Sequence, residues 1–583
     1  MKKIFSKLTI MMMVVAATGC LNHVDDTGFD PKKPEISFSQ NGADVEKGAG
    51  EITVSIKSNL PWRIKSSATW AKVDKSNGQE SGDVVVTIAR NRLRNERVAT
   101  LTAWITDNSK ATFTITQAPA EASEPITFHV KVDGDGLAEG TSWEEATTLP
   151  TAIENAGDGD VILLAAGTYT PTALITGGEA AEERTFEIHS NFTIEGGYPA
   201  DAVTGAVADP ANNETILSGN LGSTQAYHVV VVSAVKTEGA KAVLKNLTIR
   251  DGKGHSVNKD IYRFAGESTF DAGEGAGMTI GVSNLEMENC KIIGNNAYMA
   301  AGCTIAYGGN VVFKNCTVSE NYASGNGAGV WNQGEVTMYD CTISNNRADL
   351  ACAGYYGVGG KSRIYNTAFI GNDNEKGGKL GGGAYLREGK DPARSSDAIF
   401  VNCTFADNKS GSGGAVAVYG TTNPVSAAHA TFISCTIKGN TAAKGGGIWM
   451  NNQTCTATLH NCIISGNSTD IEYGGTAVAT ESQVTKGLGI YGSALLNAEG
   501  TTVSGWSFDA ASMLDKLDYW YNSLTKSFGL VAGATNPAID QGMSASELSA
   551  LATELDLDSE LTAKDQNGQE RTKKSIGSYA SNN

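Results

Sequence analysis

Apolar and polar residues alternate with a period of two through much of residues 34–120. The alternation is clearest in residues 51–56, 83–88 and 111–116, with polar or Gly/Asn turns between them. Successive side chains of a β-strand point to opposite faces, so this pattern predicts strands with one buried face. Short strands at this spacing predict an all-β sandwich of about 85 residues. We expect Trp62 and Trp70 to fill its core, because a sandwich this small needs large apolar side chains.

A longer pattern repeats between about residues 240 and 500. Each unit has an apolar residue, a Cys three positions later, a second apolar residue two further on, and an Asn five beyond the Cys. The Cys positions are Cys290, Cys316, Cys341, Thr367 (in place of Cys), Cys403, Cys435 and Cys462. The matching asparagines are Asn295, Asn321, Asn346, Asn372, Asn408, Asn440 and Asn467. A second landmark, a small-Gly-apolar triplet, follows each unit and centres on Gly302, Gly329, Gly354, Gly383, Gly414, Gly447 and Gly475, with a first copy at Gly277.

A repeat of this length with short apolar runs and no helical periodicity predicts a parallel β-helix, in which each unit forms one coil. Like positions then stack at about 4.8 Å. We expect Asn and Gly at the corners, because both tolerate left-handed backbone angles. The repeat cysteines should form a ladder of small buried side chains, since free Cys behaves as a compact hydrophobe. An odd cysteine count outside the leader and one Cys per coil do not fit a disulfide framework.

The first 20 residues differ from the rest. Lys2, Lys3 and Lys7 precede an apolar run that is too short to span a bilayer and fits a secretory signal. Small residues then lead to Cys20. This arrangement resembles a bacterial lipoprotein signal, which implies cleavage of residues 1–19 and acylation of Cys20, with palmitate among the expected chains. Residues 20–33 are polar and are expected to be a tether. No later apolar stretch is long enough for a transmembrane helix.

Composition narrows the class of protein. The chain has 583 residues, of which 68 are Gly and 12 are Pro, and 40% are hydrophobic. Without a strict Gly-X-Y period it is not collagen, and its apolar content argues against wholesale disorder. The formal net charge is −18, which disfavours nucleic acid as a partner because an acidic chain repels the phosphate backbone.

Two stretches resemble known families. The pattern Ser58-Asn59, Trp62, Trp70, Gly78, Gly82, Asn91, Arg97 and Thr116-Gln117 resembles the BACON domain, an immunoglobulin-like sandwich of surface enzymes and glycan-handling proteins. That resemblance implies either a sugar-binding domain or a spacer, and we favour the spacer because no aromatic platform is evident. The repeat resembles the right-handed parallel β-helix of pectin-lyase-like proteins, with an entry segment at about 127–200 and a closing segment at about 530–580. Lyases, hydrolases, adhesins and inert spacers share this fold, so the resemblance implies no activity.

The expected organisation is therefore an immunoglobulin-like β-sandwich followed by a right-handed parallel β-helix. The expected boundaries are a signal peptide at 1–19, a tether at 20–33, the sandwich at 34–120, a linker at 121–126 and the β-helix at 127–583, with its repeats at about 240–500.

Two outward stripes could carry function. The first lies two residues after each glycine landmark and reads Thr279, Thr304, Trp331, Tyr356, Tyr385, Val416, Trp449 and Ala477. Four of these residues, Trp331, Tyr356, Tyr385 and Trp449, are aromatic and could bind glycan, because the C–H faces of sugars stack on aromatic rings. The alternative is that long loops cover these rings and make them part of a satellite core.

The second stripe lies two residues before the Cys position and contains Lys314, Tyr339 and Tyr365, with Arg363 beside it. A uronate lyase needs positive charge to neutralise the sugar carboxylate and a base such as Lys, Arg or Tyr to remove a proton. The alternative is an ordinary solvated strand face. Stacked carboxylates for calcium and paired aspartates of a hydrolase are absent from the sequence pattern, and no metal or cofactor is expected.

These observations favour an exported outer-membrane lipoprotein, facing the cell surface, that binds or handles polysaccharide through the outer face of the β-helix. A polysaccharide lyase acting on uronic-acid glycans is the enzyme alternative, although no complete catalytic motif is present. An adhesin or structural surface rod without activity is the third. The membrane would be contacted only through the lipid anchor, and the sequence does not define the oligomeric state.

Overall fold

The structure is a computed structural model. It describes residues 33–68, 70–91, 96–119, 125–136, 138–256, 262–265, 268–374, 376, 379–390, 393–422, 425–452, 454–473, 476–477, 488–491, 495–497, 514–519, 524–530, 538–539 and 542–579. These residues form two compact units, one built mainly from residues 33–117 and the other from residues 118–579. The expected signal peptide, nearly all of the tether, Cys20 and most of the linker lie outside the described residues.

The first unit is a two-sheet sandwich, as the alternation predicted. One sheet has the order β1 (Ile36–Phe38), β3 (Gly50–Ser58), β7 (Gly82–Ile88) and β5 (Ala71–Val73). The other has the order β2 (Gly42–Val45), β9 (Ser109–Gln117), β8 (Arg97–Thr106), β4 (Trp62–Ser66) and β6 (Asn77–Gly78). Trp62 is buried in the core and its indole N–H donates to the Glu80 carbonyl at 2.9 Å, whereas Trp70 is only partly buried against the core.

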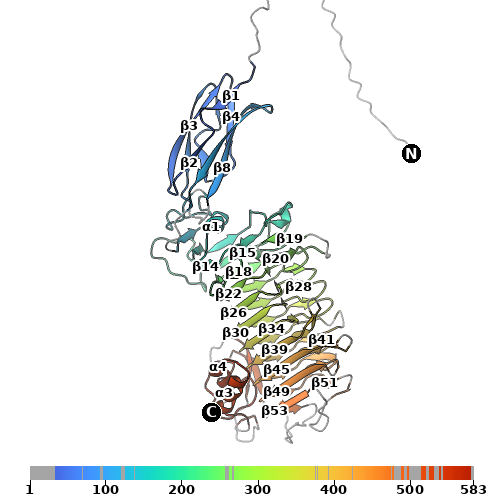
Figure 1. The fold of residues 1–583 in the computed structure, drawn as a ribbon. Coiled ribbons are helices and arrows are strands. Elements are labelled where there is room, and N and C mark those ends of the chain that lie inside the picture. The colour runs from blue at the N-terminus through green and yellow to red at the C-terminus, as the bar shows by residue number, and fades with distance from the viewer. Residues whose placement is uncertain are drawn as a thin grey trace, which may run out of the picture. The chain divides into compact units, whose positions relative to one another are not determined.

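The second unit is a parallel β-helix with three long sheets (Figure 1). Sheet 1 contains β10 (Thr127–Val130), β11 (Val161–Ala165), β14 (Thr193–Tyr198), β17 (Ala242–Lys245), β22 (Asn284–Glu288), β26 (Asn310–Lys314), β30 (Glu335–Tyr339), β34 (Lys361–Tyr365), β39 (Ser396–Val401), β45 (Ala428–Ile433), β49 (Cys455–His460) and β53 (Leu488–Tyr491). Sheet 2 contains β12 (Gly167–Tyr169), β15 (Thr215–Ser218), β18 (Thr248–Arg250), β23 (Lys291–Ile293), β27 (Thr317–Ser319), β31 (Thr342–Ser344), β35 (Ala368–Ile370), β40 (Thr404–Ala406), β46 (Thr436–Lys438), β50 (Ile463–Ser465) and β54 (Leu495–Asn497).

Sheet 3 contains β13 (Phe186–Ile188), β16 (Val230–Val232), β21 (Met278–Ile280), β25 (Cys303–Ile305), β29 (Val330–Asn332), β33 (Tyr355–Val358), β36 (Ala384–Arg387), β42 (Val416–Tyr419), β48 (Ile448–Met450), β51 (Ile471–Tyr473) and β52 (Thr476–Ala477). Short strands pair at one corner: β24 (Asn296–Ala297), β28 (Tyr322–Ala323), β32 (Arg347–Ala348), β41 (Lys409–Ser412) and β47 (Thr441–Lys444). Four hairpins are β19 (Tyr262–Ala265) with β20 (Ser268–Asp271), β37 (Gly389–Lys390) with β38 (Ala393–Arg394), β43 (Thr421–Thr422) with β44 (Val425–Ser426), and β55 (Leu514–Asp518) with β56 (Ser527–Leu530). The helices are α1 (Leu149–Asn155), α3 (Ala545–Glu554), α4 (Ser559–Ala563) and the 3₁₀ turn η1 (Ala181–Glu183).

Helices lie near both ends of the second unit. Helix α1 begins at the Thr148 cap and buries Leu149, Ala152 and Ile153 against the first coils. The closing segment packs back on later coils, where the buried Arg571 donates to the Asn402 side chain at 3.2 Å and to the Gly577 carbonyl at 2.8 Å. Among the described residues, no helix is both long and apolar enough to cross a membrane.

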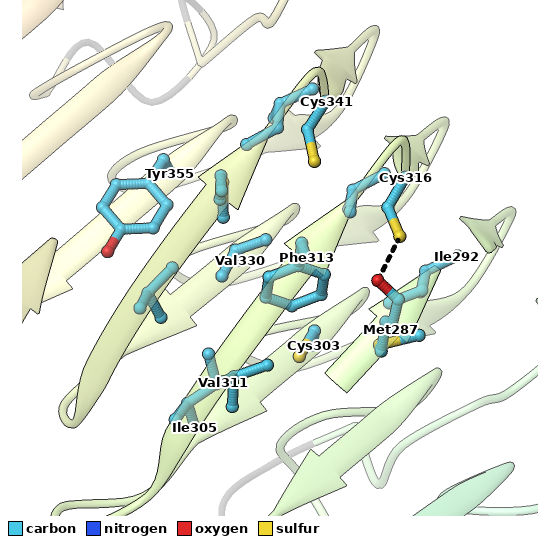
Figure 2. Packing of buried hydrophobic residues seen from close by; sticks show 14 of the residues in the cluster. Met287, Ile292, Cys303, Ile305, Val311, Phe313, Cys316, Val330, Cys341 and Tyr355 are labelled. Atoms are coloured by element: carbon cyan, nitrogen blue, oxygen red, sulfur yellow. Dashed lines mark hydrogen bonds between the residues drawn. The ribbon is translucent and has the colours of Figure 1, made fainter. Parts of the chain in front are cut away.

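The repeat cysteines form the buried ladder that the sequence predicted, and Figure 2 shows two of its members, Cys316 and Cys341. All six are free, and each thiol donates to the carbonyl two residues earlier at 3.2–3.4 Å. Thr367 makes the same bond at 2.8 Å, so the position selects a small side chain that donates one hydrogen bond.

The expectation that Asn and Gly occupy the left-handed corners is confirmed, for example at Asn315 and Gly371, but the repeat asparagines do not lie at those corners. The first six are buried inside the coil, and the side-chain N–H of each donates to the next asparagine's Oδ1 at 2.9–3.0 Å. The last member, Asn467, donates to Asp470 at 2.8 Å. The left-handed corners are instead the residue before the Cys, such as Asn315 with φ 50°, and the residue before the ladder asparagine, such as Glu320 with φ 58°. Buried amides stack here because each satisfies its neighbour.

Candidate functional site

The outer face of sheet 3 carries one continuous row of side chains. Strand register places the following residues opposite one another in successive coils: Thr279, Thr304, Trp331, Tyr356, Tyr385, Ala417, Trp449 and Glu472. We call these residues the sheet 3 row. All four aromatic residues predicted for it are present and in register, so the glycine landmarks located the row correctly from Thr279 to Tyr385.

Beyond Tyr385, two of the predicted members are wrong. Val416 points into the coil and Ala417 takes its place, because Gly414 lies opposite Gly382 rather than Gly383. Glu472, rather than Ala477, stands opposite Trp449. At Gly414 the landmark moves by one residue, and a one-residue shift exchanges the two faces of a strand. Ala477 instead lies on β52, which turns back antiparallel to β51.

The aromatic rings of the row contact one another. The Trp331 and Tyr356 ring centroids are 4.7 Å apart, and Tyr356 and Tyr385 stack at 4.9 Å with an angle of 8° between ring planes. Tyr419, two residues beyond Ala417 on β42, meets Tyr385 edge to face at 6.4 Å. These rings form a separate apolar cluster outside the coil, with Trp331, Tyr419 and Trp449 only partly buried at its margin.

Exposure divides the row into two kinds of residue. Tyr356 is 3% and Tyr385 is 4% exposed, so these two rings are covered satellite core and present no open face. Trp331 and Trp449 are half-buried and keep part of the indole at the surface. Burial raises the pKa of Tyr356 to about 12 and also raises the pKa of Tyr385, so both phenols stay protonated at neutral pH.

The cover comes from the chain that enters sheet 3. Four residues before each row position from Thr279 to Trp449, the backbone turns through a positive φ, as at Gly327 (69°) and Gly381 (70°). A Cβ added at Gly327 would lie 3.1 Å from the Trp331 ring and 3.3 Å from the Tyr356 ring. The turn therefore lies directly on the row, and at Gly327 the glycine accommodates both the positive φ and the close approach.

Two charged residues beside the tyrosines were missed by the sequence analysis. Arg387 follows Tyr385 on the outward side of β36 and lies in register with Val358 and Tyr419. Its guanidinium is 3.1 Å from the carboxylate of Glu388, which is only 4% exposed. Both follow an aromatic row residue at the start of an insertion, but nothing in the repeat pattern distinguishes them from ordinary loop residues.

Buried polar atoms without a partner gather at this face. Within the part of the chain that the structure describes, four such atoms belong to it: the indole N–H of Trp331, the indole N–H of Trp449, Arg387 Nε and Glu388 Oε2. An unsatisfied buried polar group costs about 1–3 kcal/mol, so native proteins keep few of them. Their concentration here marks the sheet 3 row as the strongest candidate binding site.

The second predicted stripe lies on the outer face of sheet 1. Lys314, Tyr339 and Tyr365 are in register on adjacent strands, and Arg363 lies on the same face of β34. Lys314 is held by Glu286 at 3.0 Å and Arg363 by Asp397 at 3.7 Å. Each cation therefore already has a carboxylate partner.

Tyr365 is not available on that face. It is 3% exposed, stacks on Tyr339 at 5.2 Å, and packs beneath Leu548 of α3 and its neighbours. Its hydroxyl accepts a hydrogen bond from the Asp558 backbone N–H at 3.3 Å. Burial raises the pKa of both tyrosines, so both phenols stay protonated at neutral pH and little tyrosinate is available to act as a base. Lys314 and Arg363 are paired and Tyr365 is covered, and the lyase role of these four residues stays a prediction.

Neither unit offers a metal centre in its described residues, where no three His, Cys, Asp or Glu side chains are grouped to hold an ion. On the sandwich, Trp104 of β8 is half-buried opposite Arg63 of β4, on the face away from the core. The sequence analysis did not single it out, because its neighbours follow the ordinary alternation.

Comparison with known proteins agrees with the two folds. Residues 35–120 match the model of the viral BACON domain, and residues 190–334 and 301–435 match that of the right-handed β-helix region. The chain thus contains a BACON-type domain and a right-handed β-helix. No curated protein matches it.

Solved structures resemble the chain at low identity. The crystal structure of pectate lyase Pel9A is 14% identical, with 78% of this chain and 98% of that chain covered at a TM-score of 0.45. A rhamnogalacturonan lyase is 14% identical, covering 67% and 91% at a TM-score of 0.28. A Bacteroides ovatus GH5 xyloglucanase, solved with a XXXG heptasaccharide, is 16% identical, covering 28% and 37% at 0.15.

Proposed function

We propose that this protein binds polysaccharide on the outer face of sheet 3, with Trp331 and Trp449 as the contact rings. One observation carries the proposal: two half-buried indoles stand in a single register row, next to buried polar atoms that lack partners. An aromatic face carries partial negative charge and attracts the C–H groups of a sugar ring. Residual polar atoms beside such rings supply the directional contacts of a binding site.

The buried tyrosines support this role. Tyr356 and Tyr385 fill the row between the two indoles and are locked by stacking and by the turns above them. A ring held rigid before binding loses little conformational entropy when the ligand arrives. Trp331 and Trp449 are four coils apart, which is about 19 Å at about 4.8 Å per coil. That span suits a chain of several sugars running along the helix axis rather than a single monosaccharide.

Binding can be tested with the full chain and a panel of polysaccharides in affinity gels. Trp331→Ala and Trp449→Ala should each weaken binding about tenfold, the effect of losing ~1.4 kcal/mol per ring. Tyr519→Ala is the matched control, because Tyr519 is an exposed ring (53%) away from the row. Retention unchanged in the double tryptophan variant would disprove the proposed site.

Two further outcomes separate the competing functions. Loss of binding in Trp104→Ala alone would move the glycan site to the sandwich. Absorbance of an unsaturated product from uronic-acid substrates would establish a lyase, while binding to host protein without glycan would indicate an adhesin.

We also propose that the protein is an outer-membrane lipoprotein at the cell surface, anchored through Cys20. The support is the lipoprotein-like signal in the first 20 residues. Labelled fatty acid should be incorporated into the wild type and not into Cys20→Ser, and protease added to whole cells should degrade the anchored protein. A wild-type protein that takes up no label, or that added protease cannot reach, contradicts the anchor or the surface location respectively.

A further inference from the structure

The Arg387–Glu388 pair lies at the middle of the sheet 3 row, beside the stacked tyrosines. Arg387 shares its outward position with Val358 and Tyr419 of the adjacent coils, and its side chain is 24% exposed. Glu388 is nearly completely buried. Burial raises the pKa values of Tyr356 and Tyr385, the nearby Arg387 lowers them, and Glu388 raises them by less, so both charges lie close to both phenols. A charged pair therefore stands where a ligand resting on the two indoles would cross the row.

Each member of the pair has one buried hydrogen-bonding atom that is unused. Arg387 Nη2 donates to Glu388 Oε1 at 3.1 Å and the guanidinium also hydrogen-bonds Tyr356, while Arg387 Nε and Glu388 Oε2 have no partner among the described residues. The unused atoms are one donor and one acceptor on consecutive residues. A sugar hydroxyl both donates and accepts, so one or two hydroxyls complement this pair. A ligand carboxylate only accepts, and it would be repelled by Glu388.

The other charges near the sheet 3 row also favour a neutral ligand over an acidic one. Arg387 is already neutralised by Glu388, and the row ends on the carboxylate of Glu472, which is 8% exposed and accepts from the Gly445 N–H at 3.1 Å. The formal net charge of the chain is −18. Buried or paired charges are screened little by salt, so they weigh more in a binding site than solvated ones.

We infer that the glycan bound on the sheet 3 row is neutral, and that Arg387 and Glu388 orient it through its hydroxyl groups. This inference rests on the proposed function and adds the substrate class and two specificity residues. The opposing feature is a pair of exposed lysines, Lys379 and Lys444, at the corner that precedes the row. Their charge is solvated and screened beyond about 8 Å at physiological salt, so it should give only weak attraction for an acidic chain.

The test compares polymers that differ only in charge. Polygalacturonate and its carboxyl-reduced form are run beside neutral glucans, xylans, mannans and galactans, with the full chain and at low and high salt. We expect salt-independent binding to a neutral polymer, weakened about tenfold by Glu388→Gln and by Arg387→Gln. Lys379→Gln and Lys444→Gln should leave it unchanged. Thermal midpoints of all four variants show whether any loss reflects misfolding, and Arg387→Lys, which keeps the charge but not the Nε donor, repeats the test if Arg387→Gln unfolds.

Each result decides a different point. Binding confined to the acidic polymer, abolished by high salt and by the lysine variants, overturns the inference and leaves polysaccharide binding intact. Neutral binding that survives Glu388→Gln and both Arg387 variants overturns the role of the pair. Failure to bind any polymer, acidic or neutral, overturns the proposed function itself.

Discussion

Asn346, in the middle of the buried asparagine ladder, is the sharpest place to test how the coils are held together. Its side chain donates to Asn372 Oδ1 at 3.0 Å and to the Val318 carbonyl at 2.9 Å. Its Oδ1 accepts from the Asn321 backbone N–H at 3.2 Å and side-chain N–H at 3.0 Å. In Asn346→Ala, the buried Asn321 backbone N–H loses this acceptor, at a cost of about 1–3 kcal/mol, and three further bonds are lost.

The loss of these bonds is partly offset, because the deleted amide no longer has to be desolvated when the protein folds. We therefore expect Asn346→Ala to lower local stability by about 2–4 kcal/mol. A chain of two units need not unfold in two states, so a local readout is needed beside urea titration. Amide hydrogen exchange at residues 318–324 should become faster by a factor between about 30 and several hundred. This factor is the loss of about 2–4 kcal/mol in local stability converted to a ratio of exchange rates.

Asn296→Ala is the control for that experiment, because Asn296 is an exposed asparagine of the neighbouring strand β24. It should change neither the exchange rate nor the urea midpoint by a measurable amount. Wild-type exchange at Asn321 in the Asn346→Ala protein would refute the ladder as a source of stability.

Three other predictions concern packing and protonation. The nine described cysteines should not react with a thiol reagent in the native protein and should all react in denaturant. Every one is buried, and burial raises the pKa of thiols such as Cys435 and Cys462. Rapid labelling of the native protein would contradict this prediction. Burial raises the pKa of Asp470 to about 7, above its unfolded value of about 3.9, so the folded state binds the extra proton and stability should fall as pH rises from about 4 to 7. Asp470→Asn should remove that fall in thermal midpoint, and an unchanged pH profile would show that Asp470 is not responsible. Tyr356→Ala should lower the unfolding free energy by about 3–5 kcal/mol because it removes a buried aromatic ring, whereas Tyr356→Phe should cost little. Equal losses in the two variants would place the contribution in the hydroxyl group rather than in the ring stack.

The first unit and the coil repeat could be predicted because both fold from local rules. Alternation identified β3, β7 and β9, and the spacing of the repeat identified the parallel coils. The inward Cys position was also predictable, since six small side chains recur beside aliphatic ones at fixed intervals. The ladder asparagines were misplaced because Asn suits both a left-handed corner and a buried amide stack, and only the neighbouring coil decides between them.

The candidate site was predictable only as a row. The glycine landmarks identified Trp331, Tyr356, Tyr385 and Trp449, but not which of these rings is covered. Cover depends on turns that fold back over the row, as at Gly327 and Gly381, and on helices near the C-terminus that bury Tyr365. The turn at Gly327 also contacts Tyr356 of the next coil, and the helices pack on Tyr365 from the far end of the chain, so no local pattern records this cover.

The amino-acid pattern therefore determines the coil: its period, its inward side chains and the line along which aromatic rings recur, because a strand's two faces alternate residue by residue. Tertiary packing decides which of those rings meets solvent and which charges stand beside it. Trp331 and Trp449 remain at the margin while Tyr356 and Tyr385 are covered, and the end of β36 places Arg387, with Glu388 directly after it, against the two tyrosines. The exposure of a ring depends on every residue that packs on its face, including residues of other coils and of the closing helices. The sequence of the ring's own coil therefore does not determine its exposure.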